Sequence, residues 1–140
     1  MTPARLKFIL LNQGSDAGVT RDMPVVTDAG LVGRVVEVTA TASKVQLIVD
    51  PDMAVNVRVL AGRAEGVLVG ELTGVLTLQF ISQDAKLEVG DTVLTSGLGG
   101  TFPPDLLVGK VESVRKRDQD VFQAATVRSA LDFNRLEIVL

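Results

Sequence analysis

Histidine, cysteine, tryptophan and tyrosine are all absent from the 140 residues of this chain. Without cysteine there are no disulfides, thiolate metal sites or cysteine nucleophiles. Without histidine there is no Ser-His or Cys-His nucleophilic pair, and no zinc site of the usual catalytic kind. These absences exclude the commonest hydrolases, so we expect no enzyme, no catalytic residue, no metal and no cofactor.

A basic surface and a long hydrophobic run are also missing. The net charge of −3 argues against a nucleic-acid partner, which would need a basic patch. The one basic run, residues 115–117, is followed by Asp118 and Asp120, and predicts a solvated hairpin tip. No apolar stretch approaches the ~18 residues of a membrane-spanning helix. Residues 1–20 carry no signal peptide, and we expect the natural protein to begin upstream of Met1.

The residues that are present alternate with a period of two. Three valines in residues 54–59 share one face of an extended strand, while Asn56 and Arg58 take the other. In residues 75–80 the same pattern turns Phe80 inward, and we expect all five phenylalanines in the core. The clear strand segments are 44–49, 54–59, 75–80 and 136–140; less regular ones are 6–11, 25–27, 31–38, 67–69, 92–95, 107–114 and 121–127. About eleven short strands predict an all-β barrel or sandwich.

A weak internal repeat suggests two related units. Residues 24–38 resemble residues 92–114, with a ten-residue insertion at 99–108 in the second copy. Chance similarity between β-hairpins is the alternative explanation. If the repeat is real, the chain forms two small β-barrels, which we assign to residues 1–62 and 63–140. In that arrangement, an exchange of strands between the first barrel and the C-terminal part is an alternative to two separate barrels.

Carboxylates in turns are the remaining candidates for chemistry. They are Asp50, Asp52, Asp84, Glu88 and Asp91, and a converging pair of them would suit general acid and base catalysis. The alternative is that aspartate is a common turn residue. We favour the turn role, because there is no Trp or Tyr to form a sugar-stacking floor and no aromatic wall to raise a carboxyl pKa.

The glycine-rich segment at residues 96–104 is the second candidate. It lacks the spacing of a dinucleotide-binding loop or a phosphate loop, and two prolines stand where a helix would have to begin. We interpret it as a structural loop in which glycine supplies backbone freedom. Its key residues are Gly97, Gly99, Gly100, Pro103 and Pro104.

An ordered series of motifs resembles the MreC family of rod shape-determining proteins. The series consists of Asn12-Gln13-Gly14-Ser15-Asp16-Ala17-Gly18-Val19, Met23-Pro24-Val25-Val26, Gly30-Leu31-Val32-Gly33-Arg34-Val35, Arg63-Ala64-Glu65-Gly66, Thr95-Ser96-Gly97-Leu98-Gly99-Gly100-Thr101-Phe102-Pro103-Pro104 and Val108-Gly109-Lys110-Val111. The motifs span nearly the whole chain. Most of their positions are glycines and apolar residues, which carry the fold rather than a binding site.

The resemblance implies two small six-stranded-type β-barrels with a topology like that of trypsin-like proteases but without catalytic residues. It implies a scaffold of the cell-elongation machinery, outside the cytoplasm and anchored to the inner membrane by an N-terminal helix. The implied partners are MreD, a class B penicillin-binding transpeptidase, RodA and the MreB complex. A coiled coil upstream of this chain would form a homodimer. The alternative is a periplasmic adaptor β domain of an efflux or secretion system.

Apolar residues on the polar side of their strands give a possible partner interface. If Phe8 and Leu10 point into the first barrel, then Ile9 and Leu11 point outward, and Ile48 points outward next to Gln46. Scattered or covered side chains are the plainer alternative, because single exposed apolar residues are common. We expect Ile9, Leu11 and Ile48 to form an exposed patch if they cluster.

Overall fold

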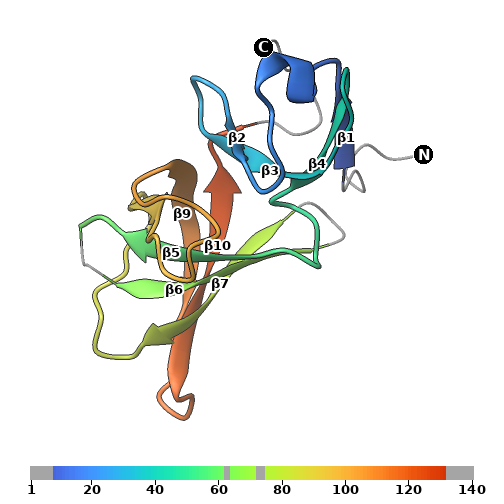
Figure 1. Cartoon of the computed structure of the whole chain (residues 1–140). Coiled ribbons are helices and arrows are strands. Elements are labelled where there is room, and N and C mark those ends of the chain that lie inside the picture. The colour runs from blue at the N-terminus through green and yellow to red at the C-terminus, as the bar shows by residue number, and fades with distance from the viewer. Residues whose placement is uncertain (1–7, 62–63, 72–74, 132–140) are drawn as a thin grey trace.

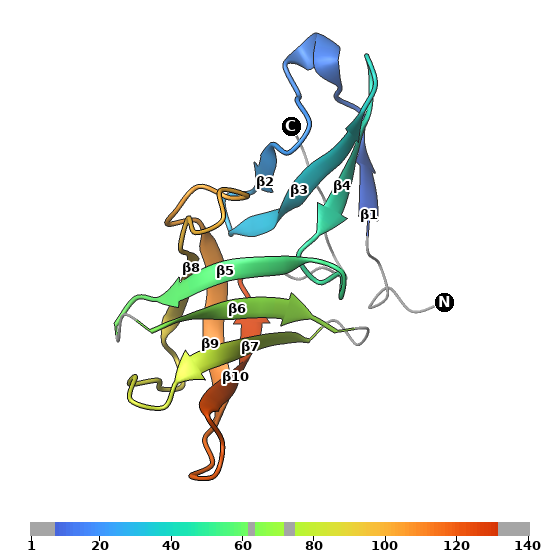
Figure 2. The same ribbon diagram turned by 60° about the horizontal axis from the view of Figure 1, so that its bottom comes forward.

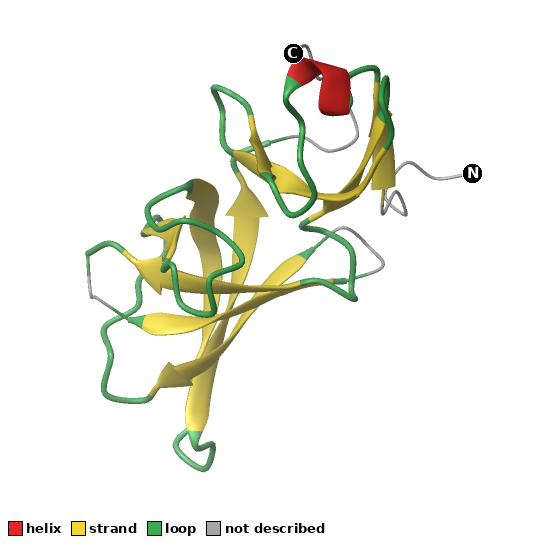
Figure 3. Cartoon of the chain, viewed as in Figure 1, coloured by secondary structure: helices red, strands yellow, loops and turns green. Residues whose placement is uncertain are grey.

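The computed structural model describes residues 8–61, 64–71 and 75–131. Within these ranges the chain is almost entirely strand and loop, and the one helical element is a three-residue 3-10 turn, η2 (Ser15–Ala17) (Figure 3). The strands are β1 (Phe8–Leu11), β2 (Pro24–Val26), β3 (Leu31–Val38), β4 (Ser43–Leu47), β5 (Ala54–Val59), β6 (Glu65–Gly70), β7 (Leu76–Ser82), β8 (Thr92–Thr95), β9 (Leu107–Arg115) and β10 (Phe122–Ser129).

Apolar alternation and turn residues predicted the positions of the strands well. Ten of the eleven segments expected from the sequence are strands, and the all-β class is confirmed. The eleventh segment, residues 136–140, lies outside the described residues. Turns at Asp50, Gly90 and Asp118 fall between strands, where their small or polar side chains suit a tight backbone.

The strands form two antiparallel sheets, one above the other in Figure 1. The first is a four-stranded sheet in the order β1-β4-β3-β2. The second closes into a six-stranded barrel in the order β10-β7-β6-β5-β8-β9. Closure pairs every barrel strand on both sides, whereas β1 and β2 are the edges of the described four-stranded sheet.

Two barrels were expected, but the described residues form only one closed barrel. The other unit is a four-stranded sheet there, and the trypsin-like topology stays a prediction. The expected division between residues 62 and 63 falls outside the described ranges. Strand β5, assigned to the first unit, pairs with β6 and β8 in the barrel, so the chain passes from sheet to barrel between β4 and β5.

One hydrophobic core runs through both sheets. The chain crosses between them at Ile48, Val49 and Asp50, all of them buried. A Cβ at Gly70 of β6 would lie 2.3 Å from the Val49 carbonyl oxygen, so glycine lets the crossing segment pack directly on the barrel. The sheet and the barrel are therefore packed together rather than joined by a free linker.

The internal repeat appears in the structure as two hairpins with the same register. Val25 pairs with Gly33 in β2–β3, and Val93 pairs with Gly109 in β8–β9. Each hairpin has its register shift immediately after that pair. The closing hydrogen bonds also correspond: the Thr27 N–H donates to Gly30 O, and the Thr95 N–H donates to Leu106 O, both at 2.9 Å. The connections enclosed are residues 28–29 in the first hairpin and 96–105 in the second.

Candidate interaction surfaces

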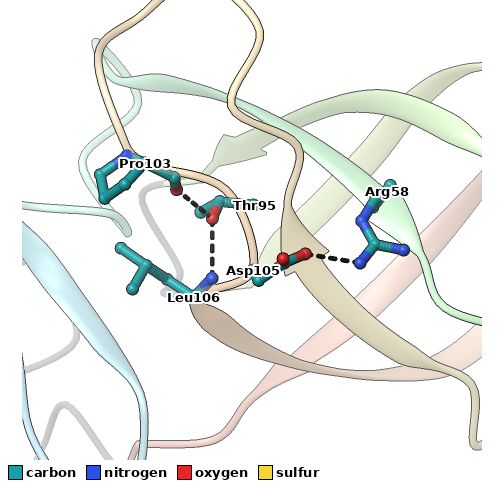
Figure 4. A network of polar contacts seen from close by, with 5 residues as sticks. All are labelled: Arg58, Thr95, Pro103, Asp105 and Leu106. Carbon is teal, nitrogen blue, oxygen red and sulfur yellow. Dashed lines mark hydrogen bonds and ion pairs between the residues drawn. The ribbon is translucent and has the colours of Figure 1, made fainter.

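The glycine-rich loop between β8 and β9 is fastened by one buried hydroxyl. Thr95 Oγ1 donates to the Pro103 carbonyl oxygen at 2.7 Å and accepts from the Leu106 N–H at 2.9 Å (Figure 4). The Asp105 N–H donates to the Thr95 carbonyl oxygen at 2.9 Å. Phe102, a residue of the loop, is buried. The base of the loop is thus held by its own backbone and by a single threonine.

The outer part of the loop is attached to β5. Asn56 Nδ2 donates to the Leu98 carbonyl oxygen at 3.1 Å, and the Ser96 N–H donates to the Asn56 carbonyl oxygen at 2.9 Å. Arg58, also on β5, forms an ion pair with Asp105 (Figure 4). These contacts join residues some forty positions apart in the sequence, and they give the loop a defined shape on the barrel wall.

Glycine is required in this loop because of backbone conformation. Gly97, Gly99 and Gly100 have φ values of +83°, +78° and +72°, in the left-handed region that side chains disfavour. A Cβ on Gly97 would also lie 3.1 Å from Pro104 Cβ, whereas a Cβ on Gly100 would meet nothing within 4 Å. Pro103 and Pro104 are exposed. Conformation and crowding therefore combine at Gly97, while conformation acts alone at Gly100.

We expect Gly97→Val to lower the free energy of unfolding by about 2–3 kcal/mol, because it adds crowding against Pro104 to a strained φ. The matched variant Gly100→Val carries strain alone and is expected to cost about 1 kcal/mol. Urea denaturation followed by circular dichroism measures both. Equal stability of the two variants and the unaltered chain would show that the loop tolerates side chains at these positions.

The predicted patch of Ile9, Leu11 and Ile48 is not an exposed surface in the structure. Ile48 is 1% exposed and Leu11 7% exposed, and Ile9 is partly buried against the core. Phe8 and Leu10 face outward instead, with Leu10 79% exposed. The expected orientation of β1 was therefore the reverse of the observed one.

The burial of Leu11 and Ile48 follows from how β1 pairs with β4 and from where β4 ends. Four residues give β1 two apolar positions on each face, so the sequence alone does not choose between its two orientations. Pairing decides it, because Leu11 lies opposite Ser43 of β4, which is itself buried. Ile48 follows the last residue of β4, and its N–H donates to the Val32 carbonyl oxygen at 3.0 Å. The alternation has stopped there, and Ile48 enters the core.

Two of the five acidic candidates, Asp50 and Asp91, hold turns through their carboxylates. Asp50 is buried, and its carboxylate accepts from Gln46 Nε2 at 2.8 Å and from the Asp52 N–H at 3.0 Å. Asp91 Oδ2 accepts from the Glu88 N–H at 2.9 Å. Asp84 is exposed and its N–H donates to Ser82 Oγ. These contacts are all local, as expected of residues in turns.

Two exposed phenylalanines form a feature that the sequence analysis missed. Phe80 and Phe122 are 58% and 46% exposed, and their rings meet edge to face with centroids 5.6 Å apart. Opposite Phe80 the pairing of β7 with β10 shifts, so that Gln79 and Phe80 together face Ala124. Phe80 is the extra residue of this bulge and has a φ of +65°, which turns its ring out of the barrel. Strict alternation had predicted it inward.

Neither a long apolar helix nor an acidic cluster is found in residues 8–61, 64–71 and 75–131. No helix in those ranges is long and apolar enough to cross a membrane. No group of three or more acidic side chains gathers there as a metal site would require. The features that stand out are therefore surfaces: the loop at residues 96–104 and the aromatic pair on β7 and β10.

Comparisons with known proteins agree on one family. The family model described as "Rod shape-determining protein MreC, barrel core" matches residues 3–140. The cell shape-determining protein MreC of Escherichia coli is 34% identical over 133 residues, which cover 94% of this chain and 36% of that protein. The chain spans about a third to a half of the length of such curated relatives.

Solved structures show the same fold. The crystal structure of MreC from Pseudomonas aeruginosa has a TM-score of 0.87 and 28% identity, covering 94% of this chain and 86% of that one. A second match is a structure described as a complex between the penicillin-binding protein PBP2 and MreC from Helicobacter pylori. Its TM-score is 0.66 and its identity 24%, with 82% of this chain and 73% of that chain covered, and at this identity the likeness concerns the fold alone.

Proposed function

The chain belongs to the MreC family of rod shape-determining proteins, and from this membership we propose that it is the partner-binding β region of a scaffold for cell elongation. The family is structural and not enzymatic. Membership favours the scaffold over an efflux or secretion adaptor. In this proposal the chain holds enzymes of peptidoglycan synthesis in place and performs no chemistry of its own.

A penicillin-binding transpeptidase is the partner with the most direct support. The Helicobacter pylori structure pairs an MreC with PBP2. Residues of this chain that are exposed and apolar, such as Phe80, Phe122 and Val121, are of the kind that protein partners cover. The family resemblance extends the proposal to MreD, RodA and the MreB complex as further members of the assembly.

The proposal also includes a location and an assembly state. The β region lies outside the cytoplasm, and an N-terminal helix anchors the whole protein to the inner membrane. Two protomers join through a coiled coil between that helix and the β region. Both statements rest on the resemblance to the family, and they make the β region the part that meets periplasmic partners.

Binding of this chain to the ectodomain of PBP2 from the same organism tests the proposal. We expect saturable binding in biolayer interferometry, with the unlabelled chain competing. In cells depleted of their own MreC, the full-length protein should restore the rod shape, whereas a version that ends before Phe8 should not. Absence of binding together with normal shape in the truncated strain would contradict a partner-binding role for this region.

A further inference from the structure

A narrow groove on the outer wall of the barrel lies beside the exposed aromatic pair. It has a volume of about 330 Å³, and it is lined by residues of β7, β9 and β10 together with Glu71 and Val75, which lie between β6 and β7. Its floor follows β10, where Ala124 and Thr126 point the same way because they are two residues apart. Small side chains, Thr77 of β7 and Ser113 of β9, lie directly opposite Thr126 on either side. The groove is therefore shaped for a segment that runs along the strands.

The aromatic pair lies beyond one end of this groove, and neither ring is among the residues that line it. Phe122 lies two residues before Ala124, on the same face of β10. The bulge at Phe80 turns its ring outward to meet Phe122, at the cost of a backbone conformation that usually requires glycine. Such strain costs of order 1–3 kcal/mol and gathers at functional sites. Because the two rings already support each other, little rotamer freedom is lost when a partner covers them.

The groove is lined by one charged residue of each sign, Glu71 and Arg115. Arg115 of β9 lines it and lies directly opposite Ala124. Ion pairs of the described residues join Asp22 to Arg34, Arg58 to Asp105 and Glu112 to Arg128; none of them includes Arg115. The exposed residues Lys116, Arg117, Asp118 and Asp120 follow in the same hairpin, which projects from the end of the barrel (Figures 1 and 2). A partner that fits here brings a carboxylate to Arg115.

We propose that this groove, with Phe80 and Phe122 beyond one end and Arg115 on its wall, is where the chain binds an extended segment of the penicillin-binding protein. The segment carries an apolar side chain that packs on the two rings and an acidic side chain that pairs with Arg115. The inference rests on the proposed function, because it assigns a place on this chain to that partner. It replaces the interface expected at Ile9, Leu11 and Ile48.

Three variants test the groove through separate properties. Phe122→Asp removes one of the two rings, Arg115→Glu reverses the charge, and Ala124→Gln fills the floor without removing any contact. Each is expected to weaken binding to the PBP2 ectodomain by about tenfold or more, as central contacts of an interface do. The Arg115→Glu defect should shrink at high salt, because charge pairs at an interface are screened.

Matched controls carry the same changes elsewhere on the surface. Val89→Asp places a carboxylate at another exposed apolar residue, and Lys110→Glu reverses an exposed cation on the same strand as Arg115. Both should bind within about twofold of the unaltered chain. Melting temperatures of all five variants identify any that are unfolded, and Ala124→Gln keeps the test valid if Phe122→Asp is one of them.

Three results would overturn the inference. If the unaltered chain does not bind the PBP2 ectodomain, the proposed function fails and the groove proposal with it. If the unaltered chain binds and the three folded variants bind equally well, only the groove proposal fails. If the variants lose self-association in light scattering but retain PBP2 binding, the groove belongs to a second copy of the chain.

Discussion

Ile48→Asp is expected to lower the free energy of unfolding by about 4–5 kcal/mol or more, enough to unfold most of the protein at 37 °C. Ile48 is among the largest fully buried side chains and lies where the sheet meets the barrel. A carboxylate there would be removed from water, and the buried carboxylate of Asp50 is two residues away. Circular dichroism during thermal and urea denaturation measures the loss.

Two control variants separate burial from charge. Ile48→Val removes one methylene from the same place and is expected to cost about 0.5–1.5 kcal/mol. Leu10→Asp introduces the same carboxylate at an apolar residue that is 79% exposed, and should change stability by no more than about 0.5 kcal/mol. If Ile48→Asp melts like the unaltered chain, Ile48 faces solvent and the interface predicted from the sequence would stand again.

Alanine at Gly33 or Gly109 is expected to cost about 3 kcal/mol or more, roughly 10 °C in melting temperature. A Cβ at Gly33 would lie 1.9 Å from the Gln46 carbonyl oxygen of β4, and one at Gly109 2.0 Å from the Arg128 carbonyl oxygen of β10. Real contacts of this kind are longer than 3 Å, so the neighbouring strand would have to move. Because the obstacle is backbone, no change of side-chain rotamer relieves it.

The equivalence of the two hairpins sharpens this test. Both glycines occupy the same position in their hairpins, so both alanine variants should be destabilised to a similar degree. Gly90→Ala is the matched control, since Gly90 has a φ of +95° and nothing within 4 Å of its missing Cβ, and should cost only about 1 kcal/mol. Normal stability of Gly33→Ala and Gly109→Ala would mean that the sheets are less closely packed than described.

The strands were predictable because their signals are local. Alternation in residues 54–59 and the turn chemistry at Asp50 depend only on neighbours in the sequence, and the structure has β5 at those residues. Gly97, Gly99 and Gly100 were also identifiable, since few residues besides glycine adopt a positive φ. The resemblance to one family was carried by the same residues, because glycines and core positions are constrained by the backbone itself.

The surfaces were not predictable because they depend on pairing between distant strands. The orientation of β1 is decided by its pairing with β4, more than thirty residues away. The bulge that turns Phe80 outward arises from the register of β7 against β10. Nothing within residues 75–80 signals the interruption, so the alternation that correctly placed Leu76 and Leu78 in the core placed Phe80 there wrongly.

The equivalent hairpins β2–β3 and β8–β9 indicate where the chain accepts an insertion. They keep the same register although one connection has two residues and the other ten, so the strands rather than the connections set the pairing. Closing a loop five times longer costs only about 1.4 kcal/mol of chain entropy. The exposed turn at Asp28 and Ala29 is therefore a suitable site for grafting a foreign peptide, since its counterpart at residues 96–105 already accommodates a long connection within the same framework.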